Sequence, residues 1–211
     1  KGGTCAAMLG YLDRFSVDLD FDNLEKTGKK ELRSELHRIF KNNNLEIKDE
    51  SKKALQFFLR YEAPPGQRNT LKLEILDKKF RNNIYKPQYL PDIDRFAICQ
   101  NIETMFANKL VALLERYEKT GSIAGRDVYD IHHFFYHEFH YNAALIKERR
   151  NTEIYDFLKE LKQFIEKKIN QRIMDQDINV LLPHKKFISI RKVLKTELLL
   201  FIDDEIQKLN R

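Results

Sequence analysis

The stretch Lys1–Asp22, KGGTCAAMLGYLDRFSVDLDFD, decides how the rest of the chain is interpreted. Within it, apolar and polar residues alternate from Ser16 to Phe21, and a period of two is typical of a half-buried strand. We therefore expect Asp18 and Asp20 to lie on one face of that strand, roughly 7 Å apart. Carboxylates held this close repel each other unless a cation lies between them, and the hard divalent ions Mg²⁺ and Mn²⁺ suit such oxygen ligands.

The same stretch begins with Gly2, Gly3 and Thr4, which precede a helix predicted over Cys5–Leu12. Glycine leaves backbone N–H groups bare, and such groups at the start of a helix bind phosphate oxygens. Gly-Gly alone is most often a turn, and Asp-x-Asp alone is most often a solvated strand edge or a helix cap. At this spacing, however, a phosphate-binding turn and a pair of metal-binding aspartates together have the layout of a nucleotidyl-transfer site.

The composition is that of a soluble globular protein. Hydrophobic residues make up 42% and charged residues 33% of the 211 residues, and no apolar run approaches the roughly 18 residues of a membrane span. The net charge of +6 permits an anionic partner such as RNA or a nucleotide but does not require one. Cys5 and Cys99 lie in apolar surroundings without a metal-ligand spacing, so we expect buried thiols and a location in the reducing cytoplasm.

Strand patterns continue to about residue 100. A helix is expected over 23–43, strands over 45–47, 54–61, 71–76 and 95–99, and an extended connector over 84–91. Within 71–76 the apolar residues alternate with Lys72 and Glu74. If this strand lies beside the one that carries Asp18 and Asp20, then Glu74 supplies a third carboxylate to the same metal site. The alternative interpretation is an exposed Lys–Glu pair on an edge strand.

From residue 101 onward the periodicity is helical. The expected helices span 102–117, 126–139, 142–150, 153–171 and 185–209. The sequence therefore predicts an α+β protein with two domains. The first, over 1–100, contains the strands, and the second, over 101–211, is all-helical.

The helical half contains four histidines that deserve separate consideration, at His132, His133, His137 and His140. His133 and His137 are one helical turn apart, a spacing that zinc sites use. No glutamate follows His133 in the manner of the zinc proteases, and no cysteine is near. We therefore interpret this segment as a partly buried helix of aromatic residues and histidines.

Four segments of the chain together resemble the AbiEii/AbiGii toxin family of bacterial nucleotidyltransferases, the toxins of type IV toxin–antitoxin and abortive-infection systems. They are KGGT, RFSVDLDF, KLEI and NKLVALLERYEKTGSIAGRDVYDI, in this order, and the resemblance extends from Lys1 to about Phe135. It implies a polymerase-β-like nucleotidyltransferase core with a mixed sheet, followed by an all-helical C-terminal domain. It also implies a divalent metal and a nucleoside triphosphate donor.

Carried over position by position, the resemblance assigns functional residues in four groups. The family's phosphate-binding turn matches Gly2, Gly3 and Thr4, and its metal strand matches Ser16, Asp18 and Asp20. The next strand motif matches Lys72 and Glu74, and the K…RD…D segment matches Lys109, Arg126, Asp127 and Asp130. The resemblance thus implies that Asp18, Asp20 and Glu74 bind the metal. It further implies that Lys109 neutralises charge on the triphosphate, while Asp127 either orients Lys109 or contacts the nucleotide.

The acceptor follows from the resemblance only as a class. Related toxins are thought to modify RNA, notably tRNA 3′ ends, and basic clusters at 147–150 and 184–186, with Tyr141 and Phe187 nearby, are compatible with RNA contact. An antitoxin encoded nearby is also implied. Two alternatives stay open. One is a small-molecule nucleotidyltransferase of the antibiotic-modifying kind, which an acidic cleft in the helical half would favour. The other is a non-catalytic module that binds an antitoxin or nucleic acid.

Overall fold

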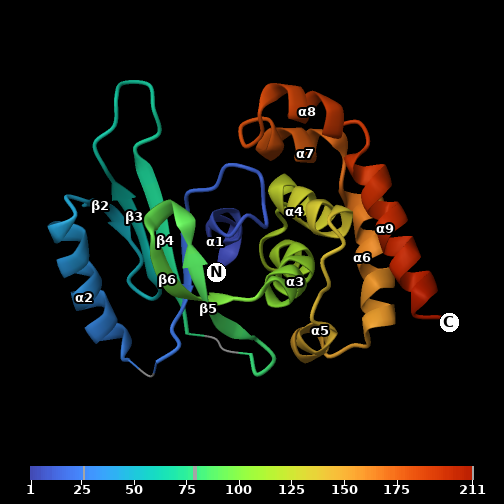
Figure 1. Cartoon of the computed structure of the whole chain (residues 1–211), viewed down its shortest axis with the longest axis horizontal. Helices are drawn as coiled ribbons and strands as arrows, with labels where there is room; N and C mark the ends of the chain where they lie inside the picture. Colours follow the sequence, from blue (N-terminus) through green and yellow to red (C-terminus); the bar gives the residue numbers. More distant parts are fainter. Residues whose placement is uncertain (26, 78–79, 211) are drawn as a thin grey trace. The chain divides into compact units, whose positions relative to one another are not determined.

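The computed structural model describes residues 1–25, 27–77 and 80–210 (Figure 1). By their contacts the residues form two compact units. The first comprises Lys1–Ala7 and Ser16–Lys79, and the second comprises Met8–Phe15 and Phe80–Arg211. The chain thus leaves the first unit after Ala7, enters the second for one short segment, and returns to the first at Ser16.

The first unit is built on a mixed four-stranded sheet. Its elements, in chain order, are α1 (Gly2–Met8), β1 (Leu19–Asp22), α2 (Lys29–Asn42), β2 (Glu46–Glu50), β3 (Leu55–Arg60) and β4 (Thr70–Leu76). The strand order is β1-β4-β3-β2, with β1 parallel to β4 and the other pairs antiparallel. The α+β class predicted from the sequence is therefore confirmed.

Alternation along these strands separates an apolar face from a polar one. Phe57, Leu59 and Leu73 are buried and pack against Phe40 of α2. Further apolar residues of the strands, of α2 and of the turn that follows it complete this core: Leu19, Leu32, Leu36, Leu45, Ile47, Leu55, Leu71 and Ile75. Because successive side chains of a strand point to opposite faces, the polar residues between them lie on the face opposite α2. The polar side chains of β1 and β4 therefore share one surface.

Element boundaries in this unit differ from the predicted ones. Helix α1 begins at Gly2 and ends at Met8, whereas Cys5–Leu12 was expected. Strand β1 begins only at Leu19, and the carbonyl of the preceding residue, Asp18, accepts a hydrogen bond from the Thr4 hydroxyl (2.6 Å). Helix α2 likewise begins later than the predicted residue 23.

The second unit contains a β-hairpin followed by seven described helices. Its elements are β5 (Tyr85–Leu90), a 3₁₀ turn (Pro91–Ile93), β6 (Arg95–Gln100), α3 (Ile102–Thr120), α4 (Gly125–Tyr136), α5 (Ala143–Arg150), α6 (Ile154–Lys168), α7 (Gln171–Ile178), α8 (His184–Ile190) and α9 (Leu194–Lys208). The strand predicted at 95–99 is confirmed, and from residue 102 to 210 the regular structure is helical. The predicted domains, 1–100 and 101–211, stay a prediction. Grouped by contacts, the hairpin of β5 and β6 falls with the helices.

Two predictions in this unit were wrong. The segment 84–91 is not a connector but contains strand β5, which pairs antiparallel with β6. Pro87 is tolerated there because each strand of a two-stranded hairpin has a free edge to which a residue without an N–H can be turned. The single helix expected at 185–209 is divided into α8 and α9, which are separated by a turn at residues 191–193.

Helix α4 is the centre of the helical packing. Val128, Ile131 and Phe134 are fully buried, and the helix contacts α3, α7 and α9. At its start, an ideal Cβ on Gly125 would lie 2.5 Å from the carbonyl oxygen of Ile173, so only glycine allows this approach to α7. Among the described helices, none has both the length and the apolar character that a membrane crossing requires.

Candidate active site

The polar face of the sheet brings two of the predicted metal ligands together. In the parallel pairing of β1 with β4, Asp20 is the register partner of Glu74. Register partners on neighbouring strands point to the same face, so these two carboxylates lie side by side on the surface opposite α2. The condition under which Glu74 was assigned to the site, that its strand lies beside the strand of Asp20, is met.

The first residue of helix α1, Gly2, packs against the side chain of Asp20. Gly2 has φ +80°, and an ideal Cβ there would clash with the Oδ2 of Asp20 and lie 3.0 Å from its Cβ. Only glycine combines the left-handed backbone with this close approach. The backbone of the predicted phosphate-binding segment therefore directly adjoins the Asp20 carboxylate.

Hydrogen bonds of the Thr4 hydroxyl connect α1 to the segment that precedes β1. The Thr4 hydroxyl lies 3.0 Å from that of Ser16 and donates to the carbonyl of Asp18 at 2.6 Å. The sequence predicted a turn ahead of the helix, but Gly2, Gly3 and Thr4 instead form the first turn of α1 itself. The predicted nucleotide-binding residues of this unit thus form one connected group, with Thr4 holding the backbone that leads into β1.

Basic side chains of the same unit neutralise its carboxylates. Arg68 pairs with Asp18 at 3.1 Å, and Lys72 pairs with Glu74 at 2.6 Å. Lys1 pairs with Asp22, the next residue of β1 that points to this face, at 2.6 Å. Within residues 1–25, 27–77 and 80–210, no group of three or more histidine, cysteine, aspartate or glutamate side chains converges as a metal site.

The donor chemistry at this surface nevertheless fits a hard divalent cation. Asp20 and Glu74 offer carboxylate oxygens from adjacent strands, and Asp18 precedes Asp20 by two residues. Gly2 itself has no side chain to occupy the space beside the Asp20 carboxylate, which an added Cβ would meet. Binding of the cation would require Arg68 and Lys72 to release the oxygens they contact.

The other predicted site residues form a buried ionic cluster in the second unit. The Lys109 ammonium on α3 lies 2.9 Å from Asp127 and 2.9 Å from Asp130, both on α4. The side chains of these aspartates are 2% and 0% exposed, whereas that of Lys109 is 18% exposed. The sequence left open whether Asp127 orients Lys109, and this contact supports that role.

Two arginines that sequence reasoning did not assign complete the cluster. Arg116, on the same helix as Lys109, pairs with Asp127 at 3.1 Å. Arg14 donates from Nε and Nη2 to the two oxygens of Asp130, at 2.5 and 2.7 Å. Arg14 begins the quoted segment RFSVDLDF, which was the one signal in the sequence that could have drawn attention to it.

Both partners of the central ion pair stay charged. Burial opposes the charge on Lys109, but attraction by Asp127 and Asp130 outweighs it, so the pKa of Lys109 lies above its ordinary value. Burial likewise opposes the charge on Asp127, yet Lys109 and Arg116 hold its pKa below the ordinary range. Lys109 is therefore a fixed cation near neutral pH and not a proton carrier.

The histidines of α4 pack with aromatic rings, as interpreted from the sequence. His133 stacks on Tyr129, and its ring centre lies 4.3 Å from that of His137. Burial, with a smaller contribution from His137, lowers the pKa of His133 to about 4, so this ring is neutral at pH 7. His132 is buried and lies 2.7 Å from the carboxylate of Glu197 on α9.

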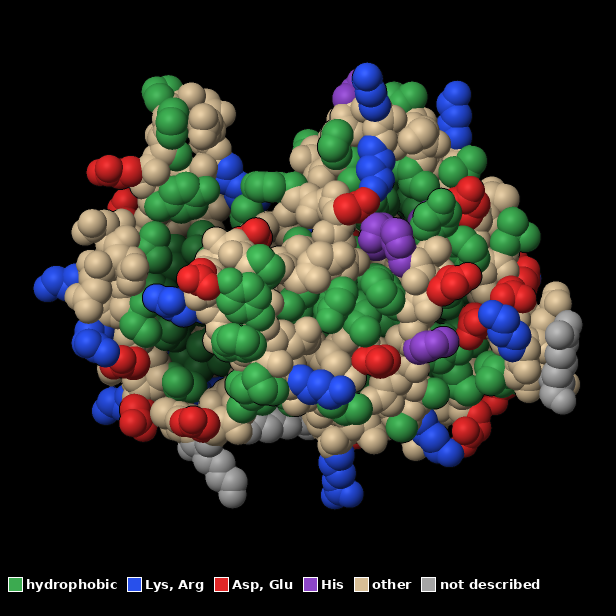
Figure 2. Space-filling model, in the orientation of Figure 1, with side chains coloured by type: hydrophobic (Ala, Val, Ile, Leu, Met, Phe, Trp, Pro, Cys, Tyr) green, Lys and Arg blue, Asp and Glu red, His purple; other side chains and the backbone are tan. Residues whose placement is uncertain are grey.

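The surface charges are mixed. Figure 2 shows Lys and Arg side chains scattered among Asp and Glu side chains over the visible face, without one basic patch. In the predicted basic cluster at 147–150, Arg149 pairs with Glu115, and Arg150 pairs with Glu118 and Glu160. These ion pairs give that cluster a structural role within the helical unit.

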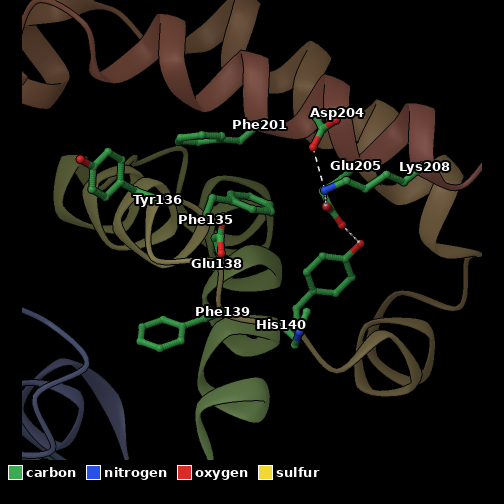
Figure 3. Close-up of a pocket in the computed structure, with 10 residues that line it drawn as sticks. Phe135, Tyr136, Glu138, Phe139, His140, Phe201, Asp204, Glu205 and Lys208 are labelled. Carbon is green, nitrogen blue, oxygen red and sulfur yellow. Dashed lines mark hydrogen bonds and ion pairs between the residues drawn. The ribbon is translucent and has the colours of Figure 1, made fainter.

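A pocket of about 510 Å³ lies elsewhere in the second unit (Figure 3). It is lined by aromatic and charged residues of α4, of the segment after α4 and of α9: Phe135, Tyr136, Glu138, Phe139, His140, Tyr141, Phe201, Asp204, Glu205 and Lys208. Lys208 pairs with Asp204 at 2.7 Å and with Glu205 at 2.9 Å, and the Tyr141 hydroxyl donates to Glu205 at 2.9 Å (Figure 3). With three carboxylates and one lysine, the pocket wall carries more negative than positive charge.

Comparison with known proteins gives one family. The family model described as nucleotidyl transferase AbiEii toxin, type IV toxin–antitoxin system, matches residues 1–187. Neither a curated protein nor a solved structure gives a match. The matched region includes both the carboxylate surface of the sheet and the ionic cluster around Lys109.

Proposed function

Because the chain belongs to the AbiEii family of nucleotidyl transferase toxins, we propose that it transfers a nucleotide from a nucleoside triphosphate to an acceptor hydroxyl and requires a divalent cation. The observation that carries this proposal is the pairing of Asp20 with Glu74 beside the Gly2 backbone. Carboxylates and bare backbone at one place are what a metal-bound triphosphate needs. The mixed sheet is compatible with a polymerase-β-like core, which we propose as the fold type of the first unit.

The carboxylates of the sheet are the proposed cation ligands. Asp18, Asp20 and Glu74 would hold Mg²⁺ or Mn²⁺, with Arg68 and Lys72 released from their present ion pairs. A bound cation would supply Lewis-acid stabilisation of the phosphoryl oxygens and lower the pKa of the acceptor hydroxyl. The strand register places Asp20 beside Glu74, and the backbone of α1 adjoins the Asp20 carboxylate at Gly2.

The remaining residues bind and orient the donor in this proposal. Gly2, Gly3 and Thr4 contribute backbone N–H groups for phosphate oxygens, and Ser16 adds a hydroxyl that now contacts Thr4. Lys109 neutralises charge on the triphosphate as a permanent cation. Asp127 holds the Lys109 ammonium in position.

RNA is the proposed acceptor, with tRNA 3′ ends as the proposed target. The net charge of +6 supports an anionic partner, although the ion pairs of Arg149 and Arg150 leave the 147–150 cluster with less free charge for it. Membership of a type IV toxin–antitoxin family supports an antitoxin as a partner. A reaction on cellular tRNA would place the protein in the cytoplasm.

One assay tests donor, cation and acceptor together. The full chain is incubated with each of the four α-labelled nucleoside triphosphates, Mg²⁺ or Mn²⁺, and total cellular RNA, and the products are separated by size. We expect label in RNA of tRNA length, from a preferred nucleotide, and no label after chelation of the cation. Absence of transfer with all four nucleotides and both ions would contradict the proposal.

The pocket in Figure 3 favours a second candidate, a small-molecule acceptor that carries amino groups. The carboxylates of Asp204 and Glu205 already hold one ammonium group, that of Lys208, and aromatic rings such as Phe135 and Phe201 offer π faces to a cation. An aminoglycoside included in the assay distinguishes the two candidates. Labelled aminoglycoside that is lost in Glu205→Gln supports the second candidate, and labelled RNA alone rejects it.

The contact between Gly2 and Asp20 yields a sharp prediction. Gly2→Ala places a methyl group against the Asp20 carboxylate and should displace that carboxylate. Since a displacement of about 1 Å can lower a rate by about a hundredfold, we expect a loss of this order in the transfer rate. Gly66→Ala is the matched control, because Gly66 has φ +81° but nothing within 4 Å of an added Cβ. Both variants carry the same backbone strain, so equal activity in the two would show that the contact does not matter. Initial rates with the preferred nucleotide provide the measurement.

A further inference from the structure

The segment Met8–Phe15 joins α1 to the approach of β1, yet it belongs to the second unit. Hydrogen bonds of that unit hold it at several points. The backbone N–H of Phe15 donates to the carbonyl of Leu181 at 3.0 Å, and the Tyr11 hydroxyl donates to the side chain of Gln88 at 3.0 Å. This connection between two proposed nucleotide-binding elements is therefore fixed by residues far away in the sequence.

Arg14 is the most buried of these attachments. Its side chain is 3% exposed, and it donates two bonds to the carboxylate of Asp130 and a third, at 3.0 Å, to the carbonyl of Phe15. The two parallel bonds fix the plane of the guanidinium group relative to α4. The bond to Phe15 ties the same guanidinium to the backbone of the segment.

Asp130 is shared between Arg14 and Lys109. The same carboxylate accepts from Arg14 and lies 2.9 Å from the Lys109 ammonium. Arg14 therefore competes with Lys109 for Asp130, and its charge opposes the attraction that the two aspartates exert on Lys109. Arg14 and Lys109 thus contact the same oxygen of Asp130, Oδ2.

We propose that Arg14 is a positioning residue, which through the carboxylate of Asp130 sets the location of the Lys109 ammonium and fixes the segment that leads into β1. Arg14 touches neither donor nor acceptor in this arrangement and acts on Lys109 through Asp130. The part that concerns catalysis rests on the proposed function, in which Lys109 binds the triphosphate.

A spectroscopic experiment tests the link without any activity. The ¹⁵N resonance of the Lys109 ammonium is recorded in the full chain, in Arg14→Gln and in Arg14→Lys, and is assigned by its loss in Lys109→Met. Arg191→Gln is the matched control, because Arg191 pairs with Asp175 in the same unit, whereas Lys109 pairs with Asp127 and Asp130. We expect the resonance to shift in Arg14→Gln, to shift less in Arg14→Lys, and to stay unchanged in Arg191→Gln. An unchanged resonance in both Arg14 variants overturns the proposal.

A double-mutant cycle tests the catalytic part. Arg14→Gln is expected to lower kcat/KM for the nucleotide by about tenfold to a hundredfold. In a Lys109→Met background, Arg14→Gln should lower kcat/KM by less than about threefold, since the effects of two substitutions are not additive when one residue acts through the other. Arg14→Lys, which keeps the charge and is the variant of choice if Arg14→Gln does not fold, should recover part of the loss. Fully additive losses overturn the proposal, whereas an inactive unaltered chain counts against the proposed function and leaves the spectroscopic result valid.

Discussion

Asp20→Asn is expected to reduce nucleotidyl transfer by at least about 10³-fold while leaving the fold intact. The substitution keeps the size of the side chain but replaces a carboxylate oxygen, and an amide is a much poorer ligand for Mg²⁺ than a carboxylate. A loss of this size corresponds to about 4 kcal/mol of transition-state stabilisation, which is the scale of a lost metal contact. The side chain of Asp20 lies on the polar face of β1, so the hydrophobic core below the sheet is unaffected.

The measurement is the rate of label transfer at saturating nucleotide and Mg²⁺, together with the midpoint of thermal unfolding. Glu74→Gln should behave in the same way, because Glu74 is the register partner of Asp20. Asp49→Asn is the control, since Asp49 lies on β2 at the other edge of the same sheet. Turnover in Asp20→Asn within tenfold of the unaltered chain, with the midpoint unchanged, would remove Asp20 from the proposed metal site.

The alternation in the sequence predicted the faces of the strands well, because the period of two depends on local geometry alone. Leu19 and Leu73 are in the core, and Asp20 and Glu74 are on the opposite face, as the patterns of 16–21 and 71–76 indicated. The pairing of β1 with β4 was only a condition of the argument. A parallel pair joins segments far apart in the chain, and no local signal specifies which strand lies beside which.

Local signals also failed where tertiary contacts decide the element. The division between α8 and α9 at 191–193 has no glycine or proline to mark it, and the periodicity of the sequence continues across it. Strand β1 starts after Asp18, whose carbonyl accepts a hydrogen bond from the hydroxyl of Thr4, 14 positions earlier in the chain. Both features depend on residues distant in sequence or on packing, which a window of neighbouring residues cannot contain.

The ionic cluster around Lys109 also includes a contact that neighbouring residues in the sequence could not predict. Lys109 and Asp127 were assigned by resemblance, without a choice between a contact with each other and a contact with the nucleotide, and their side chains lie 2.9 Å apart. Arg14 received no role, because its partner Asp130 lies 116 positions away and a lone arginine beside a strand is ordinarily solvated. A buried ion pair between distant residues leaves no periodic or spacing signal in the sequence.

That buried pair leads to the largest stability effect we expect. Asp130→Ala should lower the free energy of unfolding by about 3–5 kcal/mol, because removal of one partner leaves the other as an uncompensated buried charge. Arg14 is 3% exposed and would keep only the bond to the Phe15 carbonyl, whereas Lys109 would still have Asp127. For a chain of 211 residues, such a loss lowers the thermal midpoint by roughly 10 °C.

Asp175→Ala is the matched control for this prediction. Asp175 also pairs with an arginine of the helical unit, Arg191, but the side chain of Arg191 is 36% exposed. Loss of this ion pair should therefore lower the free energy of unfolding by about 1 kcal/mol or less. The free energy of unfolding of each variant is measured by urea denaturation, and the two values are compared. A double variant, Arg14→Leu with Asp130→Leu, should be more stable than Asp130→Ala, since it removes the orphaned charge together with its partner. If the free energy of unfolding fell no more in Asp130→Ala than in Asp175→Ala, the Arg14–Asp130 pair would be hydrated in solution. Arg14 could then not hold the segment Met8–Phe15 in the way its burial implies.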